Sequence, residues 1–156
     1  MQTDNITFLP VSLNITGKKI LIIGGGRVGF HKATILSRFT DKASIVSPTF
    51  HEGFGDLPFE CITKEYGKSD LSGAFLVYIC TENSELNRQI KHDAEQLGVL
   101  ASVCDNPALC DFISPAVFKQ DNVTIAVSSN AENVHQSIDI RNRIEKSVKN
   151  GTIQIS

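Results

Sequence analysis

The sequence predicts an α/β fold: a Rossmann-like doubly wound parallel sheet with a short C-terminal hairpin and helix extension. Two observations lead to this prediction. Short apolar, β-branched segments alternate along the chain with segments whose apolar residues recur at helical spacing, which is typical of parallel βαβ units. In addition, the first apolar segment, 19–23, is followed directly by the glycine-rich run 24–29, where a buried strand would turn into a helix.

Each expected element in the first half follows from its own pattern. The β-branched run 19–23 predicts a strand buried on both faces, and the apolar residues after it keep helical spacing up to residues 40–41. A second strand at 43–47 is expected to end before Pro48, because proline cannot donate to a sheet ladder. The segment 51–58, with two glycines and a proline, predicts a loop.

The middle of the chain repeats the alternation. Strands are expected at 59–64, 74–80 and 100–103, and the signal is strongest at 74–80. Apolar residues at helical spacing predict a helix before the last of these strands, opened by Ser84 as the N-cap and closed by Gly98.

The C-terminal part predicts a different arrangement. A hairpin is expected at 116–128, followed by a final helix at 134–148, and residues 128–130 either cap that helix or contact a ligand. We therefore expect a Rossmann domain at 1–130 and a C-terminal helical extension at 131–156.

The composition excludes several classes of protein. A length of 156 residues with 41% hydrophobic and 21% charged residues suits one globular core. Because 15 Lys and Arg stand against 17 Asp and Glu, the net charge of −2 gives no electrostatic basis for binding nucleic acid or an anionic membrane. The apolar runs are shorter than the roughly 18 residues of a spanning helix, and we expect no signal peptide and a cytoplasmic protein.

The cysteines and histidines predict no metal site. No two of the four cysteines have C-x-x-C spacing, and the four histidines form no ligand spacing with each other or with the cysteines. Cys80 lies within an apolar run and is expected to pack as a small buried hydrophobe. We expect all four thiols to be structural or incidental.

The glycine-rich run predicts a dinucleotide site. It satisfies G-x-G-x-x-G and stands between a predicted strand and a predicted helix. Gly24 would permit the tight turn, Gly26 would let the backbone approach a pyrophosphate, and Gly29 would allow close packing of helix on sheet. The free N–H groups at the start of the helix would face the phosphates.

Further candidate residues follow the other strands, because open α/β sheets bind ligands outside the carboxyl ends of their strands. After the second strand, Ser47, Pro48 and Thr49 include neither a carboxylate for a ribose 2′-OH nor a base for a 2′-phosphate. The ribose would have to be bound by backbone and hydroxyl groups of these three residues, which favours NAD over NADP. Thr81 and Asp105 follow two later strands, and the residues alone leave Asp105 open between a turn-forming and a catalytic role.

From about residue 8 to residue 145, the chain resembles the precorrin-2 dehydrogenase family, which supplies the N-terminal module of siroheme synthases. The resemblance is carried by the run G-K-K-I-L-I-I-G-G-G at 17–26, V-C-D-N-P at 103–107, C-D-F-I-S-P-A at 110–116 and I-A-V-S-S at 125–129. The block from 105 to 116 is much more specific than the glycine motif.

The resemblance implies an activity: NAD-dependent oxidation of precorrin-2 to sirohydrochlorin, followed in some members by insertion of ferrous iron. It implies that Asp105 is the key functional residue, a general base for the proton left by hydride transfer. It further implies that Arg27, Val28, Pro48 and Thr49 contact NAD and that the protein is a homodimer.

The resemblance also suggests which basic residues meet the substrate's carboxylates: Lys32, Arg141 and Arg143. Two departures from the family pattern stand out. His31-Lys32 replaces Arg-Lys, and Asn-Ala-Glu-Asn-Val at 130–134 replaces a Gly-Gly-x-Ser-Pro run. The second departure would permit an alternative function, that of a non-catalytic NAD-binding regulatory module.

Overall fold

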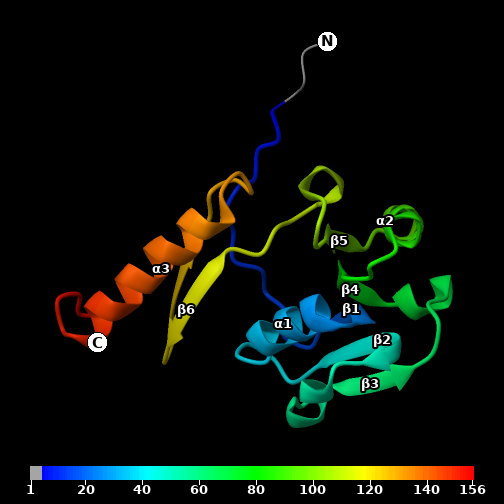
Figure 1. Ribbon diagram of the computed structural model, residues 1–156, viewed down its shortest axis with the longest axis horizontal. Coiled ribbons are helices and arrows are strands. Elements are labelled where there is room, and N and C mark those ends of the chain that lie inside the picture. Colours follow the sequence, from blue (N-terminus) through cyan, green and yellow to red (C-terminus); the bar gives the residue numbers. More distant parts are fainter. Residues whose placement is uncertain (1–4) are drawn as a thin grey trace. The chain divides into compact units, whose positions relative to one another are not determined.

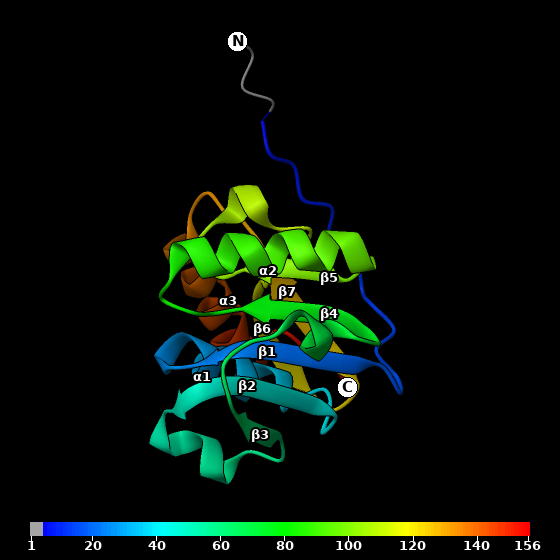
Figure 2. The same cartoon turned by 90° about the vertical axis from the view of Figure 1, so that its right-hand side faces the viewer.

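A parallel five-stranded sheet lies at the centre of Leu13–Phe112, one of two compact units in the computed structural model, which describes residues 5–156 (Figures 1 and 2). The strand order is β3-β2-β1-β4-β5. The strands are β1 (Lys19–Gly25), β2 (Ala43–Phe50), β3 (Glu60–Thr63), β4 (Ala74–Ile79) and β5 (Leu100–Val103). This arrangement confirms the predicted doubly wound fold, with the strand order reversing beside β1.

Two helices cover opposite faces of the sheet because successive residues of a strand point to opposite sides. Ile20 and Ile22 of β1 pack in one core cluster with Ala33 of α1 (Arg27–Leu36), whereas Leu21 and Ile23 pack in another with Ile90 of α2 (Ser84–Leu97). All four β1 side chains are at most 2% exposed. The central strand is therefore buried on both faces, as its β-branched run predicts.

The prediction that the second strand ends before Pro48 was wrong. β2 continues to Phe50, and its register with β1 shifts between Ile23 and Gly25, so that Gly25 pairs with Phe50. Pairing with β3 has already ended at Ser47. Pro48 thus lies in the part of β2 that no longer pairs with β3 and whose register with β1 is irregular. No hydrogen bond of the sheet needs the N–H that proline lacks at this position.

Two further local expectations need correction. The N-cap of α2 is Asn83 rather than Ser84, since its side chain accepts hydrogen bonds from the N–H groups of Glu85 and Leu86. The segment after β2 contains a 3₁₀ turn, η1 (Glu52–Asp56), because Phe54 is buried against the rings of Phe30 and Phe50. Two more 3₁₀ turns, η2 (Lys68–Leu71) and η3 (Pro107–Leu109), precede β4 and follow β5.

The second compact unit joins the chain start, up to Ser12, with Ile113–Ser156. It contains an antiparallel hairpin of β6 (Ala116–Gln120) and β7 (Val123–Val127), on which α3 (Val134–Lys149) packs. The hairpin thus groups with the final helix, whereas the domain boundary expected at residue 130 stays a prediction.

The loop before α3 keeps the backbone shape that glycines favour. Asn130 and Ala131 have φ values of 58° and 62°, in the left-handed region, at the two positions where the resembled family has glycines. The Asn130 side chain accepts from the Phe8 N–H at 2.8 Å and donates to the Ile6 carbonyl at 2.6 Å. The N-cap of α3 is Asn133, so the first of the two roles expected for residues 128–130, capping of this helix, was wrong.

None of the helices within residues 5–156 is both long enough and apolar enough to cross a membrane.

Candidate dinucleotide-binding site

The structure brings the predicted site residues to one edge of the sheet, where the carboxyl ends of the parallel strands meet. Backbone hydrogen bonds connect the strand ends there: Cys80 N–H donates to Ile23 O at 2.7 Å, and Cys104 N–H donates to Ile79 O at 3.0 Å. The glycine turn begins in the last residues of β1, Ser47–Thr49 lie in the last part of β2, and Thr81 and Asp105 come two residues after the ends of β4 and β5. Their places agree with the predicted site, and their individual roles stay predictions.

The glycines of the turn differ in what a side chain would meet. Gly24 has a φ of 112°, and a Cβ there would lie 2.5 Å from the Cys80 carbonyl oxygen. A Cβ on Gly29 would overlap the carbonyl oxygen of Gly24, so helix and strand approach closely at this position. A Cβ on Gly26 would meet no atom within 4 Å. This open space at the start of α1 is where the motif places a pyrophosphate, and the residues present fit a dinucleotide.

The start of α1 offers unpaired donors to such a group. The first N–H groups of a helix have no partner within it, and the helix dipole favours an anion there. Arg27 and Val28, the first two residues of α1, are exposed, and no acidic residue lies in this first turn. Arg27 and Val28 are therefore free to contact a bound phosphate or ribose.

Gly25 is a residue whose role the sequence did not reveal. A Cβ on Gly25 would overlap the carbonyl oxygen of Thr49 and lie 2.8 Å from the Phe50 ring. The Gly25 carbonyl also accepts from the His51 N–H at 2.6 Å. Gly25 thus lets the end of β2 lie against the glycine turn. This contact places Pro48 and Thr49, both exposed, beside the turn, whereas Ser47 is buried.

Thr81 is held by a buried amide. The Asn87 side chain, in a residue only 2% exposed, donates to the Thr81 carbonyl at 3.0 Å, and its oxygen accepts from the Thr81 hydroxyl. Asn87 lies one turn into α2. The hydrogen bonds of the buried Asn87 amide fix the loop after β4, and this role became visible only in the structure.

Asp105 lies exposed in the turn that follows β5. The loop after it is anchored by Cys110, whose sulfur lies 3.2 Å from both the nitrogen and the oxygen of Val103. Asp111 anchors it further: its carboxylate accepts from the Ala101 N–H at 3.0 Å and from the Lys91 ammonium at 2.7 Å. Cys110 and Asp111, which lie in the same sequence block as Asp105, thus hold the loop that carries Asp105.

The Lys91 ammonium is nearly buried, with a side chain 9% exposed. Burial alone would lower its pKa, but hydrogen bonds to Asp111 and Glu95 raise the pKa above its usual value. Lys91 therefore stays charged and needs the carboxylates around it.

Replacing Asp111 by alanine is expected to destabilise the fold by about 2 kcal/mol. Removing one partner of a buried ion pair costs about 3–5 kcal/mol, but Asp111 is 36% exposed and Lys91 keeps Glu95 as a second partner. Urea unfolding measures the loss. Asp41→Ala, at an exposed position before β2, is the matched control, and equal stability of the two variants would contradict the anchoring role.

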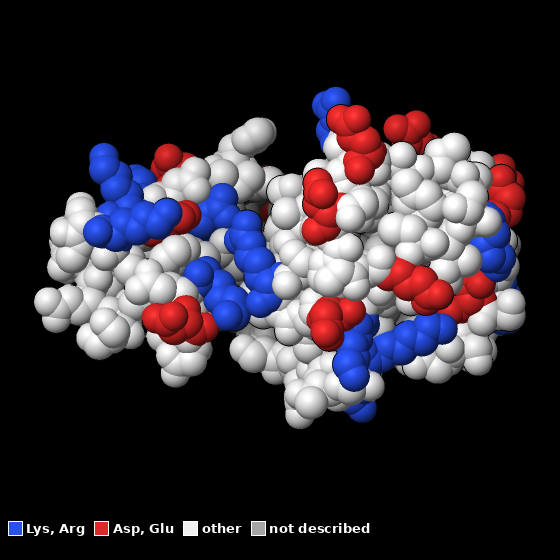
Figure 3. Space-filling model, turned by 90° about the horizontal axis from the view of Figure 1, so that it is seen from below, with Lys and Arg blue, Asp and Glu red and all other residues white. Residues whose placement is uncertain are grey.

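The basic residues suggested for substrate binding have separate environments. Lys32 is half-buried in α1, and its charge acts on the thiols of Cys80 and Cys104. Arg141 donates to the Val117 carbonyl at 2.9 Å, and Arg143 pairs with Asp139 at 3.3 Å. In the surface view of Figure 3, Lys and Arg side chains gather on the part of the second unit that contains α3.

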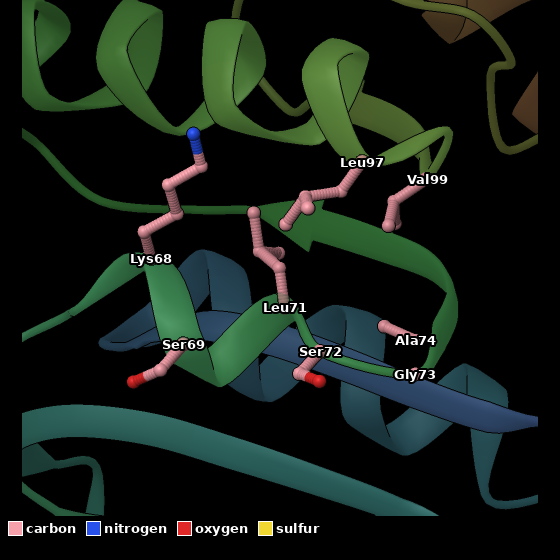
Figure 4. Close-up of a pocket in the computed structure, with 8 residues that line it drawn as sticks. All are labelled: Lys68, Ser69, Leu71, Ser72, Gly73, Ala74, Leu97 and Val99. Atoms are coloured by element: carbon pink, nitrogen blue, oxygen red, sulfur yellow. The ribbon is translucent and has the colours of Figure 1, made fainter.

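A further hollow lies outside the predicted site. A hollow of about 460 Å³ opens at the amino-terminal ends of β4 and β5, opposite the glycine turn, and no predicted site residue lines it (Figure 4). Among residues 5–156, no group of three or more His, Cys, Asp or Glu side chains could hold a metal ion.

The strand order, the glycine turn at a helix start and the open space at Gly26 define a Rossmann-type dinucleotide-binding domain. The family model described as "Putative NAD(P)-binding" matches residues 11–116, and the chain belongs to this family. The predicted kind of cofactor, a nicotinamide dinucleotide, is thereby confirmed.

Curated relatives of the chain are siroheme synthases. The chain is 33% identical over 142 residues to that of Stutzerimonas stutzeri (strain A1501), which covers 88% of this chain and 30% of the relative. It is 35% identical over 127 residues to that of Psychrobacter sp. (strain PRwf-1), covering 79% and 26%. The chain therefore spans about three tenths of the length of these relatives, and the resemblance to siroheme synthases is confirmed.

A solved structure named "SirC, precorrin-2 dehydrogenase" is similar in fold. The TM-score is 0.76, with 19% sequence identity over 90% of this chain and 70% of that chain. At this identity the similarity shows the fold alone, and it agrees with the Rossmann-like sheet described above.

Proposed function

We propose that this chain catalyses the NAD-dependent dehydrogenation of precorrin-2 to sirohydrochlorin. The observation that carries the proposal is the position of Asp105, an exposed carboxylate at the same sheet edge as the glycine turn. A module that only bound NAD would have no need for a carboxylate there or for the anchored loop behind it. The similarity to siroheme synthases supports a reaction on the route to siroheme, and the fold agrees with that of a precorrin-2 dehydrogenase.

The chemistry divides between the cofactor and the chain. NAD⁺ bound at the glycine turn would supply the acceptor for a hydride from the reduced macrocycle. Asp105 would accept the proton that the macrocycle loses with the hydride, as a general base in reach of the bound substrate. The Cys110 and Asp111 contacts hold the loop that carries this carboxylate. Asn87 holds Thr81 on the cofactor side of the same edge.

The proposal is tested by incubating the purified chain anaerobically with precorrin-2 and NAD⁺. The expected result is sirohydrochlorin, followed by its absorption, formed together with an equal amount of NADH. NAD⁺ affinity is measured separately by titration. A folded chain that binds NAD⁺ but forms no sirohydrochlorin would contradict the proposal and would favour a non-catalytic regulatory module.

Three finer parts complete the proposal: ferrous iron as a second substrate and a homodimeric state, both of which the resemblance implies, and a cytoplasmic location. Adding Fe²⁺ to the same assay tests the first, with siroheme as the expected product. Sedimentation of the purified chain tests the second. The dehydrogenase proposal stands or falls independently of these outcomes.

A further inference from the structure

Two cysteines lie side by side at the edge of the sheet that carries the candidate site. Cys80 directly follows β4 and Cys104 directly follows β5, one step beyond the paired residues Ile79 and Val103. The Cys104 N–H donates to the Ile79 carbonyl, so the two strands are still joined at this level. The two sulfur atoms are 2.7 Å apart, and both cysteines are free thiols.

The backbone positions suit a covalent bond between these sulfurs. Neighbouring strands lie about 4.8 Å apart, within the range of about 4.4–6.8 Å that the Cα atoms of a disulfide span. Both side chains pack with the core cluster on the α1 side of the sheet, so they point the same way. Closing the bond therefore needs no rearrangement of the strands.

The environment distinguishes the two thiols. A hydrogen bond from Cys80 and the charge of Lys32 lower the pKa of Cys104, despite burial and the nearby charge of Asp105. The same hydrogen bond and burial raise the pKa of Cys80, which is only 8% exposed. Cys104, which is partly exposed, is thus the nucleophile of the pair.

We propose that Cys80 and Cys104 form a redox modification site, which a small-molecule disulfide such as oxidised glutathione converts into an intramolecular disulfide. The bond would join the residue before Thr81 to the residue before Asp105. It would thereby tie the cofactor side of the sheet edge to the loop that carries the carboxylate. This inference concerns the thiols alone and does not depend on the proposed dehydrogenation.

The reaction proceeds in two balanced exchanges. The Cys104 thiolate attacks one sulfur of oxidised glutathione, whose S–S bond breaks, and one glutathione leaves as a thiolate with the electron pair. Cys80 then loses its proton and attacks the Cys104 sulfur, which expels the second glutathione. The two cysteines are oxidised by two electrons in all, and one oxidised glutathione is reduced to two thiols that take up the two protons.

The second exchange is assisted by the first. The hydrogen bond and the charge that raise the Cys80 pKa both involve the Cys104 sulfur as a thiolate. Once Cys104 is a mixed disulfide, that negative charge is gone and only burial and Asp105 still oppose ionisation of Cys80, while Lys32 favours it.

The other two cysteines serve as internal comparisons. Cys61 lies exposed on β3, so an oxidant can reach it, but it has no such partner. Cys110 is half-buried, and its thiol donates hydrogen bonds to the carbonyl oxygens of Val103 and Asn106. Burial raises the pKa of both thiols, which makes them weaker nucleophiles than Cys104.

The test treats the purified chain with oxidised glutathione and maps the modified peptides by mass spectrometry without reduction. In the wild type we expect a Cys80–Cys104 linkage that dithiothreitol reverses. In Cys80→Ser we expect a stable glutathione adduct on Cys104, because the resolving thiol is gone. In Cys104→Ser we expect neither product at Cys80, and Cys61→Ser should leave the linkage unchanged.

Two results would overturn the proposal. One is wild-type protein in which Cys61 carries glutathione while Cys80 and Cys104 stay reduced. The other is a linkage between Cys104 and Cys110 in place of Cys80 and Cys104. Circular dichroism of each serine variant, recorded first, shows that the fold is retained.

Discussion

Replacing Asp105 by asparagine is expected to lower kcat/KM for precorrin-2 oxidation by about 10²–10⁴-fold, the usual contribution of a general base. Asparagine has nearly the same shape as aspartate but cannot accept the proton. Asp105 is exposed in a turn that Cys110 and Asp111 hold from behind, so the substitution should leave the fold intact. The affinity for NAD⁺ should change less than twofold.

The measurement is the initial rate of sirohydrochlorin formation, combined with a titration of NAD⁺. Asp41→Asn is the matched control, since Asp41 is an exposed aspartate of the same unit and precedes β2, at the other end of the strands. It should behave as the wild type. Unimpaired turnover by the Asp105→Asn variant would show that Asp105 only forms the turn. This is the alternative to a catalytic role that the sequence leaves open.

Replacing Gly26 by valine is expected to weaken NAD⁺ binding at least about 100-fold, which corresponds to about 2.7 kcal/mol. The branched side chain would fill the open space at the start of α1, through which the motif lets a pyrophosphate approach the backbone. Gly26 has a φ of −79°, which valine can adopt. Stability should therefore fall by no more than about 1 kcal/mol, for the poorer helix N-cap.

Two other glycines make this prediction specific. Gly55→Val also places a side chain in open space, but in η1, and should leave NAD⁺ affinity unchanged. Gly29→Ala should instead lower the unfolding midpoint strongly, because its Cβ would overlap the Gly24 carbonyl oxygen. Unchanged NAD⁺ affinity in a folded Gly26→Val variant would place the pyrophosphate elsewhere.

Much of the fold follows from local pattern. The β-branched run at 19–23 can be satisfied only by burial on both faces, which requires helices on both sides of a central strand. The glycines after it mark a turn into a helix, and the structure shows the separate steric reasons for Gly24 and Gly29. Asp105 could be singled out because a residue that follows a parallel strand must lie at the ligand-binding edge.

Other features escaped the sequence because they depend on contacts between distant segments. Nothing near Pro48 indicates that β2 continues past it, since the shift in register comes from the pairing of Gly25 with Phe50. The left-handed backbone of Ala131, next to Asn130, is likewise not indicated by its side chain. Asn130 is stabilised there by hydrogen bonds to Ile6 and Phe8, more than 120 residues away in the chain.

The sequence by itself determined the α/β class, the glycine turn and the strand ends at which a dinucleotide site forms, because these depend on periodicity and on the steric demands of single residues. Only the tertiary structure decided which side chains support that site. In the sequence, Asn87 and Asp111 look like ordinary polar residues. They act as anchors because their partners, the Thr81 carbonyl and the Lys91 ammonium, are shielded from water that could replace these hydrogen bonds. Cys80 and Cys104, 24 positions apart, become neighbours only because β4 and β5 lie side by side.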